Sequence, residues 1–316
     1  MSTPPNARGY GRTRAKFILI GEHSVVHGRP AIAMPLPSLT MDAIAEAAPG
    51  PLRLESAYYS GPLAEAPATV AAPAAAIRAT LRHLGAAPSG VRVVTDSTIP
   101  AERGLGSSAA TAGAIVHALA DLYDRSLSPS EHFELVQVAE RVAHGSPSGL
   151  DAVATDASHP VWFQNGLASE LPLRMGACFV IADTGVRGRT KDAVADVRAL
   201  LRSRPVWAGE RIDRLEGLTR EAARDLAEDR PAQLGARMSQ AHLALRELGV
   251  SSRELDRLVA AAEAAGALGA KLTGGGQGGC MVALAADEDA GRRIAAALQS
   301  AGATRSWVYD TLLSPA

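Results

Sequence analysis

The sequence predicts a mixed α and β protein with two domains, and three observations support this. The chain has 316 residues, whereas a single hydrophobic core stops growing at roughly 250 to 300 residues. Apolar residues make up 47% of the chain, enough to fill two cores. Short apolar or alternating runs typical of strands are interspersed with longer segments of helical period. We therefore expect an α+β fold.

The first part of the chain reads as strands followed by helices. The run at residues 17–20 is continuously apolar, as in a buried strand, and later runs alternate. The Pro- and Ala-rich residues 60–68 show no period and are predicted to form a surface connection. The expected elements in this part are strands at 17–20, 39–45, 52–58 and 91–96, and a helix at 67–84.

A capping box marks the next helix. Ser128 is followed by Pro129, which fits the first helical position, and by Glu131 three residues after the serine. The helix is expected to run to His144 and to end at Gly145.

Periodicity lapses at residues 164–176, where we place the junction between the domains, 1–172 and 173–316. The second domain begins with a buried strand and continues with helices, one of them opened by Ser251 with Glu254 three residues later. The expected elements are strands at 178–183, 281–285 and 306–312, and helices at 190–202, 206–227, 231–248 and 252–265.

Charge and composition exclude several classes of protein. The formal net charge is −1, with an isoelectric point near 6.7, so no chain-wide basic surface is available for a nucleic acid. The sequence lacks both a secretory signal and a continuous apolar run long enough to span a membrane, so we expect a cytoplasmic protein without a membrane partner. The two cysteines, Cys178 and Cys280, are predicted to be buried thiols.

Lysine is scarce in this chain. Of the 32 basic residues only three are lysines, namely Lys16, Lys191 and Lys271. Each of them either marks a place that requires a compact ammonium group or survives by chance in an arginine-biased sequence.

Residues 100–114, PAERGLGSSAATAGA, place a glycine-rich turn between a strand and a helix. This arrangement directs backbone N–H groups and the positive end of a helix dipole toward an anion, typically a phosphate. Gly104 and Gly106 permit close approach, and Ser107 or Ser108 can cap the helix or bind a metal ion. A capped tight turn without a ligand is the alternative.

Two better-known phosphate motifs do not fit. The chain contains no Gly-Lys dipeptide, so a Walker A loop is absent. Gly104, Gly106 and Ala109 satisfy the weak G-x-G-x-x-A pattern, but a helix, a turn and another helix follow where a dinucleotide-binding fold requires a parallel strand.

A second glycine cluster lies in residues 271–280, KLTGGGQGGC. Five of the six residues from 274 to 279 are glycine. Such a run is entropically unfavourable, which favours close backbone contact with a ligand over a plain flexible hairpin.

Several ionisable residues lie beside these loops. Glu140 shares a helix face with Phe133 and Val136, so it is either a carboxylate that binds a cation or a member of a surface salt bridge. Asp151 lies near a predicted helix start, where the dipole keeps a carboxylate ionised.

Near the N terminus, Lys16 heads a buried strand and needs an anionic neighbour, for which Asp151 is a candidate. Glu22 and His23 follow that strand, and His23 is either a residue of the site or a structural histidine. The other histidines considered lie beside neither a glycine loop nor a carboxylate pair and are predicted to be structural: His83, His117, His132, His159 and His242.

Four segments in order, AKFILIGEHSVVHGRPAIAMPLP, PAERGLGSSAATAGA, ERVAHGSPSGLD and KLTGGGQGGC, resemble the GHMP small-molecule kinases. The resemblance spans residues 16–280. It implies a mixed-sheet N-terminal domain, a ferredoxin-like C-terminal domain and an active site in the cleft between them. The first and third segments most resemble family members that phosphorylate the 5-hydroxyl of mevalonate, so the resemblance implies mevalonate and ATP as substrates and Mg²⁺ as cofactor.

The resemblance also implies roles for individual residues. Asp151 takes the proton from the hydroxyl, and Lys16 lowers the pKa of that hydroxyl. Ser108 and Glu140 coordinate Mg²⁺, and substrate contacts come from Lys16, Glu22, His23, Asp151 and Thr190. The residues expected around the ATP phosphates are Gly104, Leu105, Gly106, Ser107, Ser108, Ala109, Gly274, Gly275 and Gly276.

Two alternative functions and one departure from the family pattern accompany the resemblance. Phosphomevalonate is the rival substrate, with Arg187 and Arg189 as candidate partners for its phosphate, and a non-enzymatic ligand sensor on the same fold is an alternative of another class. Arg14 and Ala15 replace the Pro-Gly usual in the family before the first lysine. A homodimer is a further expectation.

Overall fold

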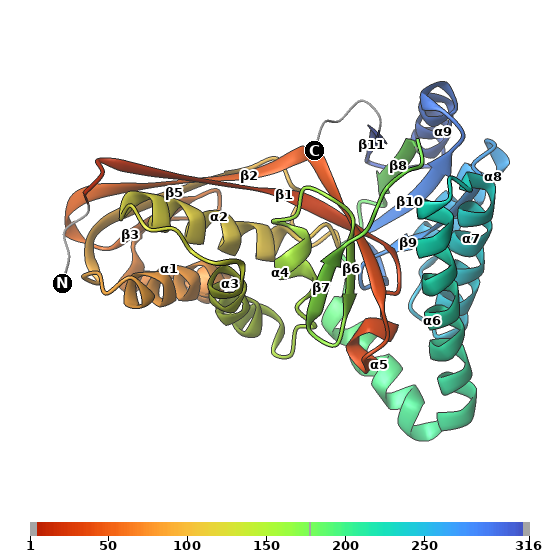
Figure 1. Cartoon of the computed structure of the whole chain (residues 1–316), viewed down its shortest axis with the longest axis horizontal. Coiled ribbons are helices and arrows are strands. Elements are labelled where there is room, and N and C mark those ends of the chain that lie inside the picture. Colours follow the sequence, from red (N-terminus) through yellow and green to blue (C-terminus); the bar gives the residue numbers. More distant parts are fainter. Residues whose placement is uncertain (1–4, 177, 312–316) are drawn as a thin grey trace. The chain divides into compact units, whose positions relative to one another are not determined.

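The computed structural model describes residues 5–176 and 178–311, and these residues group into two compact units. Unit 1 comprises the described residues within Met1–Ala15, Pro37–Ala101 and Gly106–Asp156. Unit 2 comprises those within Lys16–Leu36, Glu102–Leu105 and Ala157–Ala316. Figure 1 shows the course of the chain through both.

Unit 1 contains a mixed sheet. Strands β1 (Arg8–Ile20) and β2 (Ala31–Pro51) both begin or end in this unit, and β1 pairs with β2. In unit 1, β2 pairs antiparallel with β5 (Ser89–Ser97), β5 pairs parallel with β3 (Arg53–Ser56), and β3 pairs antiparallel with β4 (Tyr59–Pro62). One face of β2 is buried by alternate residues, as a half-buried strand requires.

Strand β1 starts nine residues before the predicted strand at 17–20, at Arg8. The sequence pattern did not predict this first part of the strand, because Gly9 and Gly11 interrupt the apolar alternation. A Cβ on Gly11 would lie 2.0 Å from the carbonyl oxygen of Ala114, so the strand backbone lies directly on a helix and has no room for side chains there.

The prediction of a surface connection at residues 60–68 is wrong in its first half. Strand β4 occupies that stretch, and Leu63 directly after it is 2% exposed. The Tyr59 hydroxyl donates a hydrogen bond to the carbonyl of Pro62 at 2.6 Å. Gly61 leaves space for the Tyr59 ring, because a Cβ there would lie 2.6 Å from the hydroxyl oxygen.

The helices of unit 1 pack together on one side of its sheet (Figure 1). They are α1 (Ala71–His83), α2 (Ser107–Leu122), α3 (Pro129–His144) and the short α4 (Leu150–Ala154). The capping box that opens α3 is present with both of its hydrogen bonds, and the helix ends at Gly145 as predicted.

Unit 2 contains strands from two sheets. The first part of β2 pairs with β6 (Val161–Gln164), which pairs with β7 (Leu167–Glu170). The residues at 164–176 that lack periodicity therefore hold an exposed strand. The other sheet is antiparallel with the order β11-β8-β10-β9. Its strands are β8 (Cys178–Asp183), β9 (Gly269–Thr273), β10 (Cys280–Ala285) and β11 (Arg305–Asp310).

Within this sheet β8, β9 and β10 are buried along their whole length, and Cys178 and Cys280 are buried thiols as predicted. The predicted last strand extended to Leu312, which lies outside the described residues.

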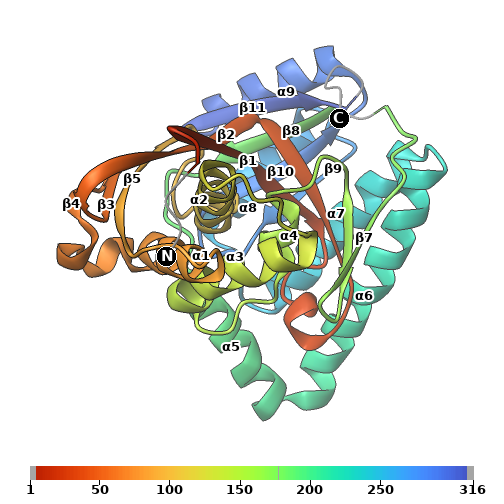
Figure 2. The ribbon, with the colours of Figure 1, turned by 60° about the vertical axis from the view of Figure 1, so that its left-hand side comes forward.

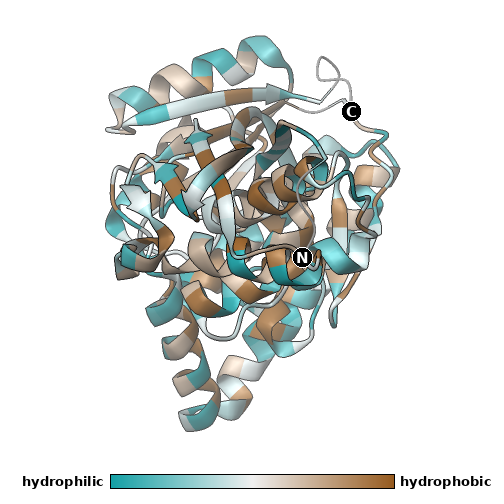
Figure 3. Ribbon diagram, turned by 90° about the vertical axis from the view of Figure 1, so that its left-hand side faces the viewer, coloured by the Kyte–Doolittle hydropathy of each residue, from teal (hydrophilic) through white to brown (hydrophobic). Residues whose placement is uncertain are grey.

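The helices of unit 2 are α5 (Thr190–Ser203), α6 (Pro205–Ala227), α7 (Pro231–Glu247), α8 (Arg253–Ala264) and α9 (Glu288–Ser300). Helices α6 and α7 run side by side (Figures 1 and 2), and α7 and α8 pack on β9 and β10. Helix α9 packs on β8 and β11, and its mixture of polar and apolar residues is visible at the top of Figure 3.

The serine that caps α8 is Ser252, not Ser251 as predicted. The Ser252 hydroxyl accepts a hydrogen bond from the backbone N–H of Leu255 at 3.3 Å, whereas the Ser251 hydroxyl donates to Asp256 at 2.6 Å. Among the described residues, no helix has the length and apolar content needed to cross a bilayer.

Candidate active site

Lys16 is the buried cation of the site in unit 2. It lies in β1 with 1% of its surface exposed. Its backbone N–H donates to the carbonyl of Leu105 at 3.1 Å, and its ammonium donates to the carbonyl of Gly104, also at 3.1 Å. The start of the first glycine loop, residues 104–108, is thus held directly on β1.

Thr273 fastens the end of β9 to the same strand. Its hydroxyl donates to the carbonyl of Ile18 at 2.9 Å and accepts from the N–H of Ile18 at 2.8 Å. A Cβ on Gly104 would lie 3.1 Å from the carbonyl oxygen of Thr273, and one on Gly274 would lie 2.9 Å from the Cα of Gly104. The two glycine-rich segments therefore lie against each other, and side chains at these two positions would separate them.

The second glycine loop, residues 274–279, packs on the backbone of other segments of unit 2. A Cβ on Gly275 would lie 2.6 Å from the Cα of Thr190, and one on Gly276 would lie 2.0 Å from the carbonyl oxygen of Val250. Gly276 also has φ +78°, in the left-handed region. The sequence suggested a ligand as the reason for these glycines, but tight packing within unit 2 already requires them.

A buried ion pair lies under the second loop. The Lys271 ammonium contacts the Glu22 carboxylate and also donates to the carbonyl of Leu272 at 2.6 Å. Lys271 is 0% and Glu22 1% exposed. Burial raises the pKa of Glu22 and lowers that of Lys271, while the charge of each partner opposes the shift of the other. Each charge therefore depends on its partner to remain in the interior.

His23 contacts the second loop. It is the residue before the short 3₁₀ turn Ser24–His27 and has φ 62°, uncommon for a side chain of this size. Its Nε2 lies 2.9 Å from the carbonyl oxygen of Gly275, so Nε2 carries the hydrogen and donates. Burial lowers the pKa of His23 to about 4. The ring is therefore neutral at pH 7, and its donor is already used by the protein.

In unit 1 the start of α2 is open. The N-cap is Gly106 with φ 77°, and no described side chain caps the helix, in contrast to α3. Ser107 and Ser108 are half-buried in the first turn. The sequence left open whether a serine would cap this helix or its backbone would bind an anion, and neither Ser107 nor Ser108 caps it.

Glu140 and Asp151 lie on neighbouring helices of unit 1. Glu140 is 3% exposed on α3, so its side chain is buried and does not lie on the surface. Its Oε2 lies 3.8 Å from Nε2 of His144. Asp151 is half-exposed in the first turn of α4, after Gly149 with φ 96°. The predicted metal ligands, a Ser108 hydroxyl and a Glu140 carboxylate, are hard oxygen donors of the kind that Mg²⁺ prefers.

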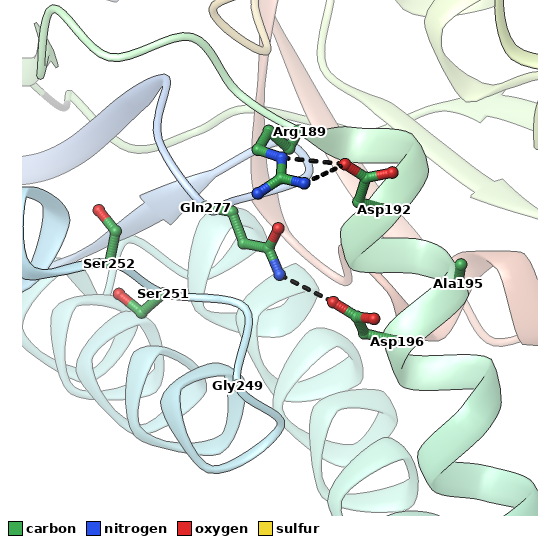
Figure 4. A pocket seen from close by; sticks show the side chains of 8 residues that line it. All are labelled: Arg189, Asp192, Ala195, Asp196, Gly249, Ser251, Ser252 and Gln277. Carbon is green, nitrogen blue, oxygen red and sulfur yellow. Dashed lines mark hydrogen bonds and ion pairs between the residues drawn. The ribbon is translucent and has the colours of Figure 1, made fainter.

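A polar cavity of about 500 Å³ opens beside the second loop in unit 2 (Figure 4). Within it Arg189 forms an ion pair with Asp192 at 2.8 Å, and the Gln277 side chain donates to Asp196 at 3.0 Å. Arg187 pairs with Glu102 at 3.2 Å. Both arginines considered for a second phosphate thus have carboxylate partners. The cavity is lined by Arg189, Asp192, Ala195, Asp196, Gly249, Ser251, Ser252 and Gln277.

Unit 2 thus brings together Lys16, Gly104, Glu22 and His23 with the second glycine loop, and it places Thr190 against Gly275. Sequence reasoning gave no role to Lys271, although the scarcity of lysine had drawn attention to it. Thr273 was also missed, because a threonine in a buried strand gives no separate signal.

Comparison with known proteins identifies the class. The chain matches the sequence profiles "GHMP kinases N terminal domain" over residues 71–158 and "GHMP kinases C terminal" over residues 222–304. It is 33% identical to mevalonate kinase of Pyrococcus furiosus and 35% identical to that of Thermococcus onnurineus, in both cases over 92% of this chain and 92% of the relative. The chain therefore belongs to the GHMP kinase family.

A solved structure agrees with these relatives. The crystal structure of L. major mevalonate kinase in complex with R-mevalonate matches with a TM-score of 0.85 and 29% identity, covering 98% of both chains. The predicted resemblance and the predicted two-domain α+β fold are confirmed. As a family member the chain is an ATP-dependent small-molecule kinase, as predicted.

Proposed function

We propose that this chain transfers the γ-phosphoryl group of ATP to the 5-hydroxyl of mevalonate, giving 5-phosphomevalonate. The observation that carries the proposal is the similarity to mevalonate kinases over nearly the whole length of both chains. The positions required for phosphoryl transfer are also filled: a base at Asp151, an ammonium at Lys16 and oxygen ligands at Ser108 and Glu140.

The first glycine loop is proposed to hold the ATP phosphates. Lys16 fixes the backbone of Gly104, and the N–H groups of Ser107 and Ser108 open an uncapped helix. Unpaired amides and the helix dipole favour a polyphosphate at this point. Leu105, Gly106 and Ala109 complete this loop. Gly274, Gly275 and Gly276 are proposed to support it through the contact between Gly274 and Gly104.

Mg²⁺ would be held by Ser108 and Glu140, and when bound it would neutralise part of the charge on the phosphates. Glu140 is 3% exposed in α3 and supplies a carboxylate oxygen, the type of ligand that Mg²⁺ prefers.

On the acceptor side, Asp151 is proposed to remove the proton of the 5-hydroxyl. Lys16 would lower the pKa of that hydroxyl and stabilise the developing negative charge. Thr190 is exposed at the first position of α5 and is proposed to contact the substrate.

Glu22 and His23 are proposed to take an indirect part. Glu22 is committed to Lys271, and His23 is neutral and donates to Gly275. We propose that they shape the substrate side by fixing the second loop, and that neither brings a charge to the mevalonate carboxylate. The cytoplasmic location and the homodimer stay predictions from the sequence.

The test is a coupled ADP-release assay with mevalonate, phosphomevalonate and galactose. Of the three substrates, only mevalonate is expected to give rapid ADP release. Preference for phosphomevalonate would assign the rival substrate, and no release with any of the three would favour a ligand sensor.

The matched variant is Asp151→Asn, which keeps the shape of the side chain and removes the base. It should lower kcat by roughly 10² to 10⁴ while ATP still binds. Unchanged turnover would remove Asp151 from the mechanism.

A further inference from the structure

Three side chains of unit 1 form a cluster that the kinase reaction does not use. His117 lies on α2, His132 on α3, and Asp156 just after α4. The Asp156 carboxylate lies 2.7 Å from Nε2 of His117 and 3.6 Å from Nδ1 of His132. The two imidazole rings are stacked with centroids 4.2 Å apart. One nitrogen of each ring and a carboxylate oxygen all lie within 4.8 Å of one another.

The position of His132 is fixed by the fold. The residue is 4% exposed, and its Nε2 lies 3.5 Å from the carbonyl oxygen of Gly113 in α2. Gly113 borders the ring, since a Cβ there would lie 3.4 Å from it, an ordinary contact distance, and 3.0 Å from Cγ2 of Thr13.

The contact with Gly113 bears on the protonation of the two ring nitrogens of His132. Nε2 faces the carbonyl of Gly113, and Nδ1 faces the carboxylate of Asp156. A carbonyl accepts, so this contact favours a hydrogen on Nε2 in the neutral ring. The lone pair of Nδ1 then faces the Asp156 carboxylate, which is also an acceptor. Two acceptors facing each other are unfavourable unless a proton or a metal ion lies between them. A histidine that donates its second ring N–H to a backbone carbonyl is the usual outer arrangement of a metal ligand.

The charges around the cluster are mixed. Burial acts to raise the pKa of Asp156, but the hydrogen bond from His117 and the charges of His132, His117 and Arg14 hold it below its ordinary value. The carboxylate is therefore ionised at neutral pH. Burial lowers the pKa of His132 and favours the neutral ring, although the charge of Asp156 acts to raise that pKa. Arg14 is the opposing influence, because its positive charge repels a second cation.

We propose that His117, His132 and Asp156 form a binding site for a divalent transition-metal ion of the Zn²⁺ type, with the fourth position left to water. Two imidazole nitrogens and one carboxylate oxygen are a common ligand set for such ions, and the hard ion Mg²⁺ prefers oxygen ligands alone. The site is separate from the proposed Mg²⁺ ligands Ser108 and Glu140.

A bound ion would connect α2, α3 and the turn after α4. Ser108, Glu140 and Asp151 lie on these same three helices. The ion is therefore expected to act on the stability of unit 1, by binding the folded chain and not the unfolded one. At about 100 times the Kd this raises Tm by roughly 5 °C or more.

The experiment uses the full chain, freed of metal by dialysis against a chelator and kept without ATP and Mg²⁺. Titration with Co²⁺ should produce the visible absorption of a four-coordinate site at one ion per chain, and Zn²⁺ should displace it and raise Tm. In His117→Ala the affinity should fall by roughly 100-fold or more. His83→Ala, another half-exposed histidine paired with a carboxylate in the same unit, should bind as the wild type does.

His117 is chosen for truncation because its side chain is 36% exposed, so its loss leaves little cavity. Asp156→Asn is the isosteric second variant if His117→Ala lowers Tm without metal. Arg14→Gln should bind more tightly than the wild type. Absence of the Co²⁺ band at millimolar ion, or equal affinity in His117→Ala and the wild type, would overturn the proposal. Neither result depends on kinase activity.

Discussion

The two glycine-rich loops of this kinase use the same residue for different purposes. The first, residues 104–108, leads into α2, where Gly106 begins the helix and no described side chain caps it. The second, residues 274–279, closes the hairpin between β9 and β10, and its glycines lie against Thr190 and Val250. Gly106 in the first loop begins a helix that no described side chain caps, whereas the glycines of the second loop, like Gly104, let backbone pack on backbone. Glycine content alone therefore does not indicate which loop meets a ligand.

The supports of the loops differ as well. The first loop is held by Lys16 through two backbone carbonyls, those of Gly104 and Leu105. The second loop follows β9, where Lys271 forms a buried ion pair with Glu22. The loop also accepts a hydrogen bond from His23. Disturbing the second loop should therefore reduce stability, whereas disturbing the first should mainly reduce activity.

The largest effect on stability is expected from Lys271→Met. Removing the ammonium leaves the Glu22 carboxylate buried and unpaired, which should lower the free energy of unfolding by about 3 to 5 kcal/mol. Urea unfolding followed by circular dichroism measures the change.

The control is the double variant Lys271→Met with Glu22→Gln. Without a charge left behind, it should be more stable than Lys271→Met alone. Equal stability of the single and the double variant would show that the pair is not what supports the second loop.

His23 should make the second loop sensitive to acid. Its pKa is about 4 in the folded chain against 6.5 in the unfolded chain, so as pH falls from 6.5 to 4 the unfolded state takes up a proton and the folded state does not. Stability is full above pH 6.5 and decreases as pH falls through this window, by up to about 3 kcal/mol.

The measurement compares the unfolding free energy of the wild type and His23→Asn at several pH values. Asparagine tolerates a positive φ and does not titrate, so the variant should lose less stability between pH 6.5 and 4. The difference isolates His23 from Glu22, whose raised pKa acts with the opposite sign, and from His242, which titrates in both proteins. Parallel curves for the two proteins would contradict the prediction.

Variants at two glycines distinguish the effect of close packing on stability from the effect of backbone strain. Gly276 and Gly249 both have φ +78°, but only Gly276 has a neighbour where a Cβ would lie, the carbonyl oxygen of Val250 at 2.0 Å, while Gly249 has nothing within 4 Å. Gly276→Ala should therefore be less stable than Gly249→Ala by roughly 1 to 3 kcal/mol. Equal unfolding free energies would mean that the close packing of the second loop contributes nothing to stability.

Local signals made much of the fold predictable. The capping box at Ser128 fixed the start of α3, and the helical periods placed α5 to α8. The early part of β1 was missed because Gly9 and Gly11 interrupt its alternation, and β4 was missed because its turn residues resemble a loop. Ser251 was chosen over Ser252 as the cap of α8 because neighbouring serines are equivalent without backbone angles.

The site was predictable only where chemistry and sequence order coincide. The order of four motifs indicated Lys16, Ser108, Glu140 and Asp151. Contacts between distant segments were not predictable. No feature of the sequence around Lys271 indicates that Glu22 is its partner. The same holds for His117 and His132, because the carboxylate beside them, that of Asp156, comes from another element.

The smallest effect on stability, and the sharpest test of the first loop, is expected from Ser108→Ala. A half-buried hydroxyl in a helix should change the free energy of unfolding by less than about 0.5 kcal/mol. If Ser108 binds Mg²⁺, the concentration of Mg²⁺ needed for half-maximal activity should rise by roughly 10-fold or more. Ser107→Ala is the matched control, because Ser107 is proposed to act through its backbone N–H, which alanine keeps. An unchanged Mg²⁺ requirement in Ser108→Ala, or an equal rise in both variants, would show that the hydroxyl of Ser108 is not a ligand and that the first loop works through its backbone alone.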